Sequence, residues 1–328
     1  MNQSEFLKGG YEQKLFSNKR KNNIHVGLHI SKGKSKSLYV ALKTDITFYK
    51  INAAQIFVSN PRTAAPIQTS EENKKLIKNM IHKDNIDLFV HTAYITTMLW
   101  SGKPYGIKLL KDQMRLALEY GAKGVVLHLP KKSCTDVVKI LQQYKDYINM
   151  IDIDLLLEPP AFKPDKNCSY EIPDNLNKLT SLITSIGLKH WGYTIDTAHL
   201  WSSISEKERK NGLTIETYNG ADQWIKQLSE ETKKRIKLIH LNGSHSNTGK
   251  DVHAIPVFGI KKNKDDNLNI PDYLWGKYKD NIYESSLYRF IQFARLYNIP
   301  MILEINVGTG KQIQDSLTLI NKLLVTNV

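Results

Sequence analysis

The sequence is poor in cysteine and has no long apolar run. Its 328 residues include only two cysteines, Cys134 and Cys168, too few for a disulfide framework or a thiolate metal cluster. No stretch approaches the roughly 18 apolar residues of a membrane span. Residues 1–23 also lack the apolar core of a secretory signal. We therefore expect an intracellular protein in a reducing compartment, with no membrane partner.

Acidic residues are scarce relative to basic ones. The chain has 46 Lys and Arg against 32 Asp and Glu, a formal net charge of +14. One interpretation is a surface of solvated lysines without function. The other is a polyanionic partner, because clustered basic charge attracts phosphate backbones without reading their sequence. Charge alone leaves both open.

Short apolar, β-branched runs recur along the chain, as in parallel strands buried on both faces. They are IHVGLHI from Ile24, AAQIFVS from Ala53, DLFVHTA from Asp87, GVVLHLP from Gly124, DLLLEPP from Asp154, WGYTIDTAH from Trp191, RIKLIHLN from Arg235 and MILEIN from Met301. Helix-like amphipathic segments separate most of them. This alternation predicts an α/β fold, a (β/α)8 barrel, with an open doubly wound sheet as the alternative.

The length predicts one barrel domain with two additions. A barrel of this kind takes about 250 residues. We expect a basic, flexible arm over residues 1–23 and a single catalytic barrel domain over residues 24–328. A polar insert from Lys261 to Asn281 accounts for the remaining length.

Imidazole and carboxylate groups cluster at the ends of these runs. The nine positions are His91, His128, Glu158, Asp196, His199, His240, Asp251, His253 and Glu304. Each alone fits an ordinary buried or solvated polar residue. The carboxyl ends of barrel strands all face one rim, so all nine are expected to converge there. His25, His29, His82, His190 and His245 follow no such rule and are interpreted as structural.

Four carboxylates crowded at one mouth would repel one another unless cations neutralised them. Imidazole with carboxylate, and no thiolate, suits zinc or manganese. Nine ligands divide among three divalent ions, whose formal +6 less the −4 of the carboxylates leaves +2. A bridging hydroxide and a phosphodiester would balance that charge, which favours metal-assisted phosphoryl hydrolysis.

Several motifs carry a family resemblance. VGLHIS, IFVSNPR, IDTAHLWSSI, IHLNGS and ILEIN resemble the endonuclease IV type of apurinic/apyrimidinic (AP) endonuclease. These are three-metal DNA-repair enzymes built on a (β/α)8 barrel. The likeness covers almost everything after the N-terminal arm. HTAYITTMLWS and YNGADQWIKQL most resemble members from large cytoplasmic DNA viruses, so the nucleus, cytoplasm, viral factory and virion are the expected locations.

The resemblance implies three Zn²⁺ ions, with Mn²⁺ as the alternative at the more exposed third site. It implies these ligand sets: His91, His128 and Glu158 for the first, Glu158, Asp196, His240 and Glu304 for the second, and His199, Asp251 and His253 for the third. Glu158 and Glu304 are the implied catalytic residues. The implied substrate is double-stranded DNA with an abasic site.

Further expectations follow from the same resemblance. Cleavage 5′ to the lesion would leave a 3′-hydroxyl and a 5′-deoxyribose phosphate, and 3′-phosphatase or phosphodiesterase trimming would accompany it. Arg62 and Tyr94 match residues that enter the duplex, where a missing base leaves little stacking to break. We expect a monomer.

The chain departs from the family pattern beside the ligands. Val252 replaces the arginine of an Asp-Arg-His motif, and Pro159 and Pro160 follow Glu158 where the family has Asn-Thr. The family's glycine-rich segment after the third-site ligands is reduced here to AIPVFGI, which follows His253. None of these changes removes a candidate ligand. They put DNA contacts in question, because proline offers no backbone N–H.

Two other functions remain as alternatives. Metal-dependent sugar isomerases and epimerases place histidines and carboxylates at the same rim, but one or two ions would not need nine ligands. A catalytically inactive DNA-binding barrel would have no reason to keep so costly a charge cluster.

Overall fold

The computed structural model describes residues 24–161, 169–204, 214–246, 250–261, 269–305 and 309–326. The expected arm over residues 1–23 lies outside them, as does Cys168. The division into that arm and one domain over residues 24–328 stays a prediction. No helix of the described residues is long and apolar enough to span a membrane.

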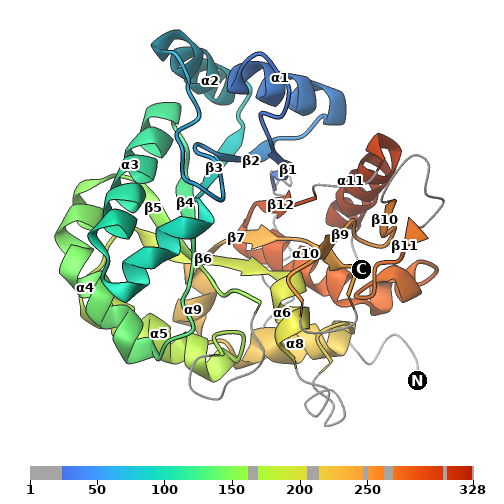
Figure 1. The fold of residues 1–328 in the computed structure, drawn as a ribbon. Helices are drawn as coiled ribbons and strands as arrows, with labels where there is room; N and C mark the ends of the chain where they lie inside the picture. The colour runs from blue at the N-terminus through green and yellow to red at the C-terminus, as the bar shows by residue number, and fades with distance from the viewer. Residues whose placement is uncertain are drawn as a thin grey trace.

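Eight parallel strands form a closed barrel (Figure 1). In chain order they are β1 Val26–Ile30, β2 Ala53–Phe57, β3 Asp87–His91, β4 Gly124–His128, β5 Asp154–Glu158, β6 Trp191–Asp196, β7 Ile236–His240 and β12 Met301–Leu303. Each strand pairs with its neighbours in the chain, and β1 pairs with both β2 and β12. The predicted (β/α)8 barrel is therefore confirmed, and the alternative of an open sheet is wrong.

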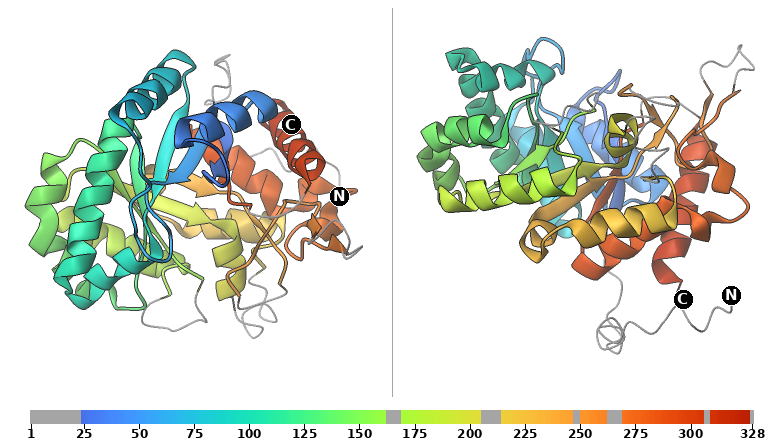
Figure 2. Two further views of the ribbon diagram at one scale, coloured as in Figure 1. Left: turned by 45° about the horizontal axis from the view of Figure 1, so that its top comes forward. Right: turned by 90° about the horizontal axis from the view of Figure 1, so that it is seen from below.

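Helices form a ring outside the strands, and the further views show the same arrangement (Figures 1 and 2). They are α1 Leu38–Tyr49, α2 Glu71–Lys83, α3 Pro104–Tyr120, α4 Cys134–Met150, α5 Pro173–Ser185, α6 Thr197–Ser203, α8 Tyr218–Gln227, α9 Glu230–Arg235, α10 Ser286–Tyr297 and α11 Gly310–Val325, with 3-10 helices η1 Tyr94–Ser101, η2 Gly276–Tyr278 and η3 Ile282–Glu284. Ser70 caps the start of α2, because its hydroxyl accepts from the Asn73 N–H. Gly121 ends α3 with φ 77°.

The barrel is filled on the inside by one small apolar cluster. It consists of Ala53, Phe89, Val126, Leu156, Leu238 and Ile302. Alternate strand residues point outward and pack in the larger core beneath the helices. Strand side chains alternate between faces, so the next inward position lies two residues further along. Gly27 is the inward residue of β1, and a Cβ there would lie 1.7 Å from the Ala53 carbonyl oxygen.

The expected polar insert from Lys261 to Asn281 is not simply polar. Short strands β8 Gly243–Ser244, β9 His253–Ala254, β10 Ile260–Lys261 and β11 Asn269–Ile270 form two antiparallel pairs in this region. Asp272, Leu274 and Trp275 within the expected insert are buried. The Asp272 carboxylate accepts backbone N–H bonds from Ser244 and Val257 at 3.0 and 2.8 Å. The described part of the segment, residues 269–281, therefore folds back onto the chain before it, and the buried Asp272 carboxylate ties it to Ser244 and Val257.

Candidate metal centre

All eight barrel strands place a polar side chain at the carboxyl end of the barrel interior. Each lies two residues beyond an inward-facing residue of its strand. That inward residue belongs to the apolar cluster inside the barrel in six strands and is Gly27 in β1 and Thr194 in β6. The eight are His29, Gln55, His91, His128, Glu158, Asp196, His240 and Glu304. The two-residue period of the strands therefore aims all of them at one mouth.

The first candidate group joins the ends of β3, β4 and β5. One ligand atom from each of His91, His128 and Glu158 lies within 4.8 Å of the others. Glu158 Oε2 is 3.4 Å from His91 Nε2 and 3.1 Å from His128 Nε2. His91 uses its other nitrogen to donate to the Thr92 carbonyl at 2.8 Å, which leaves Nε2 facing the group.

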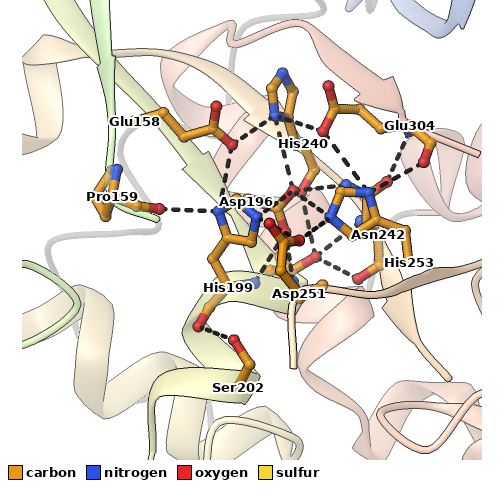
Figure 3. Close-up of polar contacts among 12 residues, drawn as sticks. Glu158, Pro159, Asp196, His199, Ser202, His240, Asn242, Asp251, His253 and Glu304 are labelled. Carbon is orange, nitrogen blue, oxygen red and sulfur yellow. Dashed lines mark hydrogen bonds and ion pairs between the residues drawn. The ribbon is translucent and has the colours of Figure 1, made fainter. Parts of the chain in front are cut away.

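The second group shares Glu158 with the first. It also includes Asp196, His240 and Glu304, from three neighbouring strands (Figure 3). His240 Nδ1 is 3.0 Å from Glu158 Oε1 and 3.2 Å from Glu304 Oε2. A carboxylate common to two groups is the arrangement expected where two cations share a bridging ligand.

The third group joins α6 to the β7–α10 region. Asp196, His199 and His253 can present ligand atoms within 4.8 Å of one another. Asp251 Oδ1 lies 3.1 Å from His199 Nε2 and 3.3 Å from His253 Nε2. This group is more open than the others, because the Asp251 side chain is 49% exposed whereas Glu158 is fully buried.

At Glu158 and His253, burial opposes the charged form, but pairing with neighbouring groups outweighs it. Burial alone would raise the pKa of Glu158, but the His240 and His128 imidazoles hold it well below its usual range. Burial likewise lowers the pKa of His253, but Asp196, Asp251 and Glu304 raise it to about 9. Without a cation, protons on His199, His240 and His253 therefore compensate the carboxylates.

The residues fit divalent cations. Within the described part of the chain, every ion pair of these four carboxylates is to a histidine, and no lysine or arginine reaches them. Among the described residues, the buried Glu158 Oε2 and His253 Nε2 have no hydrogen-bond partner and only the histidine–carboxylate ion pairs described above. Such atoms are costly unless they coordinate an ion.

Two residues that the sequence analysis overlooked hold the ligands in place. Asn242, fully buried after β7, donates to Asp196 Oδ2 and accepts from the Glu304 N–H, both at 2.7 Å. Gln55, fully buried on β2, contacts His240, Glu304 and His29. The expectation that His29 follows no strand-end rule is therefore wrong, because its Nδ1 also lies 3.5 Å from Glu304 Oε1. A count of inward positions along each strand would have found Gln55 and His29.

The Pro159 departure has a structural account. The Pro159 carbonyl accepts a 2.9 Å hydrogen bond from His199 Nδ1–H (Figure 3). The residue is used through its oxygen, so the missing N–H of proline costs nothing at this contact. Val252 lies partly exposed between Asp251 and His253, and nothing in the structure explains its replacement of arginine.

Tyr94 and Arg62 lie beside the mouth. The Tyr94 ring centroid is 5.9 Å from the rings of both His91 and His128, and the residue is 49% exposed. Burial of its hydroxyl, with nearby carboxylates, raises the pKa of Tyr94 to about 12. Arg62 is exposed in the turn that follows β2, whose Pro61 carbonyl accepts from the Tyr94 N–H. The two side chains expected to enter DNA therefore belong to adjoining loops.

A model of the xylose isomerase-like TIM barrel matches residues 49–322. The chain belongs to this family. A probable AP endonuclease of African swine fever virus is 30% identical over 286 residues, 85% of this chain and 87% of that protein. A probable endonuclease 4 of Mycoplasmopsis synoviae is 24% identical over 306 residues, 89% of this chain and 96% of that protein. The predicted membership in the endonuclease IV type of AP endonuclease is confirmed by these relatives.

Solved structures of related proteins have a similar fold. The crystal structure of AsfvAP:AG superposes with a TM-score of 0.76 at 26% identity, covering 92% of this chain and 99% of that one. Endonuclease IV from Thermus thermophilus gives a TM-score of 0.65 at 18% identity, covering 92% and 98% of the two chains. These likenesses support the barrel fold.

Proposed function

We propose that this protein is an AP endonuclease that hydrolyses the phosphodiester 5′ to an abasic site in double-stranded DNA. The products would be a 3′-hydroxyl and a 5′-deoxyribose phosphate. The observation that carries the proposal is the convergence of three ligand groups that share Glu158 and Asp196. Relatives named probable AP endonuclease and endonuclease 4 support it, as does the nuclease chemistry open to such a site.

The three groups would hold three divalent ions. Zn²⁺ suits their imidazole and carboxylate donors, and Mn²⁺ is the alternative at the exposed group with Asp251. Bound ions would supply a hydroxide at neutral pH and neutralise charge on the attacked phosphate. Glu158 would hold two groups at a fixed spacing. Glu304, on the His240 side, would accept the proton of the attacking water.

Charge on the rim supports a nucleic-acid partner. The loops that follow β1 to β4 span residues 31–37, 58–70, 92–103 and 129–133, and contain no acidic residue. Their basic residues are Lys32, Lys34, Lys36, Arg62, Lys103, Lys131 and Lys132. Seven cations around the mouth would bind phosphates on either side of the cleaved bond. This distribution favours the polyanion interpretation of the net charge.

Two side chains are suited to the lesion itself. Tyr94, half exposed against His91 and His128, and Arg62, on the adjoining turn, would occupy the gap left by the lost base. A nucleotide without a base has little stacking to lose when it leaves the duplex. We propose that the protein acts as a monomer within the cell, in DNA repair.

The test uses purified protein and a duplex with a single tetrahydrofuran abasic analogue. Wild-type protein with zinc or manganese is expected to cut 5′ to the analogue, and chelation or Glu304→Gln is expected to abolish cutting. Equal cutting of undamaged duplex, or none with either metal supplied, would refute the proposal. A second duplex with a 3′-phosphate at a nick tests 3′-end trimming.

Metal analysis and a sugar-isomerisation assay of the same purified protein test the alternatives. A metal content near one ion per chain, with isomerisation of a sugar and no DNA cleavage, would favour an isomerase or epimerase. Salt-sensitive DNA binding without cleavage at full metal occupancy would favour an inactive barrel.

A further inference from the structure

Gln55 contacts three polar side chains at the mouth, although it is not a candidate metal ligand. The residue is fully buried on β2. Its amide nitrogen lies 2.9 Å from His29 Nδ1 and donates to Glu304 Oε1, and its amide oxygen lies 2.8 Å from His240 Nε2. One side chain therefore links β1, β2, β7 and the residue after β12.

The chemistry of these partners fixes which way the amide points. Glu304 is a candidate metal ligand, and a carboxylate that binds a cation is deprotonated. An ionised carboxylate only accepts, so the atom beside it must be the NH₂ group. The amide oxygen then faces His240, and an oxygen of this kind accepts only. His240 Nε2 must carry a proton.

That proton determines which nitrogen of His240 faces the candidate ions. With Nε2 donating to Gln55, Nδ1 is the atom directed at Glu158 and Glu304. His91, His199 and His253 are oriented the other way: each donates from Nδ1 to a backbone carbonyl, which leaves Nε2 for a metal. For His240, a side-chain amide performs the role that backbone carbonyls perform for those three.

We propose that Gln55 is a positioning residue that holds His240 in the Nε2–H form and orients Glu304, and thereby sets the divalent-metal affinity of the group formed by Glu158, Asp196, His240 and Glu304. The inference rests on the metal binding in the proposed function. Partners that fix the tautomer of a metal-binding histidine commonly change metal affinity about 10- to 100-fold when removed.

The test replaces Gln55 with methionine, which has a similar length but no amide. A matched control is Gln113→Met, because Gln113 is also buried, accepts from the Ala93 N–H and donates to Thr96, yet touches no candidate ligand. Zinc affinity is measured by chelator competition without DNA. We expect about a 10- to 100-fold loss for Gln55→Met and an unchanged affinity for Gln113→Met. Equal affinities of Gln55→Met and wild type, or equal losses in the two variants, would overturn the proposal.

A second measurement does not depend on a variant that folds. In zinc-loaded wild-type protein labelled with ¹⁵N-histidine, the ring proton of His240 is expected on Nε2; a proton on Nδ1 would refute the assignment. Both readouts are independent of DNA cleavage. A protein that binds zinc through this tautomer but cuts no abasic DNA would therefore disprove the proposed function and leave the role of Gln55 intact.

Discussion

At the amino-terminal end of the barrel, Asp87 Oδ2 lies 3.1 Å from His25 Nδ1, and Asp87 also pairs with Lys123. At the carboxyl end, four carboxylates meet six histidines, and among the described residues no lysine or arginine joins them. Both clusters use the same residue types at strand ends. The first has a permanent cation to compensate its single carboxylate, and the second has only imidazoles, which can exchange their protons for metal ions. Composition alone therefore does not distinguish a structural cluster from a metal centre; the missing permanent cation does.

The strongest test of this comparison removes one carboxylate from each end. Glu158→Gln is expected to lower abasic-site cleavage about 10²- to 10⁴-fold, because two ligand groups share that carboxylate. Asp87→Asn is expected to leave cleavage unchanged and to lower the free energy of unfolding by about 1–3 kcal/mol. Cleavage assays and urea unfolding of both variants check this. A larger loss of cleavage in Asp87→Asn than in Glu158→Gln would reverse the assignment.

The second test uses pH on protein freed of metal. The pKa of His253 is raised from 6.5 to about 9 when folded, so its proton stabilises the folded state fully below about pH 6.5. That contribution, at most about 3 kcal/mol, is lost as pH rises through 9. Urea unfolding from pH 6 to 9.5 should therefore show falling stability in chelated protein and a smaller fall in zinc-loaded protein. Rising stability of the chelated protein across this range would contradict the pairing.

A third test concerns the segment that carries the candidate ligands Asp251 and His253 and that the buried Asp272 holds on the barrel. Asp272 accepts backbone N–H bonds from Ser244, Val257 and Leu274, and Val257 has the strained φ of 72°. Asp272→Asn would place an NH₂ group against a backbone N–H. Urea unfolding should show a loss of about 1–3 kcal/mol, whereas the exposed Asp280→Asn should change little. Similar losses in the two variants would mean that the buried hydrogen bonds are not what stabilises the segment.

The smallest expected effect concerns the two rims. Lys34 and Lys103 are exposed in loops at the carboxyl end, and Lys189 is exposed in a loop at the amino-terminal end. Each phosphate contact contributes about 0.9 to the slope of log affinity against log salt. Lys34→Ala with Lys103→Ala should reduce that slope by about 2 in a DNA-binding titration, and Lys189→Ala should leave it unchanged. An equal change in both would show that lysines act only through net charge.

The barrel and the nine candidate ligands could be predicted from patterns along the chain. Buried parallel strands must be apolar, so each interruption by an imidazole or carboxylate at a strand end was visible in the chain. The structure brings all nine to one mouth. The family motifs also predict that Arg62 and Tyr94 act together on DNA, and the two residues lie in adjoining loops.

The contacts of Gln55, Asn242 and His29 could not be predicted from the chain and are seen only in the folded protein. A buried amide has no charge, and its importance depends on which atoms it meets across strands that are far apart in sequence. Gln55 and Glu304 are separated by 249 positions, and the closure of β1 against β12 brings them into contact. The burial of Asp272, Leu274 and Trp275 was likewise hidden, because a segment rich in polar residues can still fold onto a barrel when a carboxylate satisfies its backbone N–H groups. The type of each side chain is known from its position in the sequence, but a hydrogen bond depends on two side chains that folding brings together.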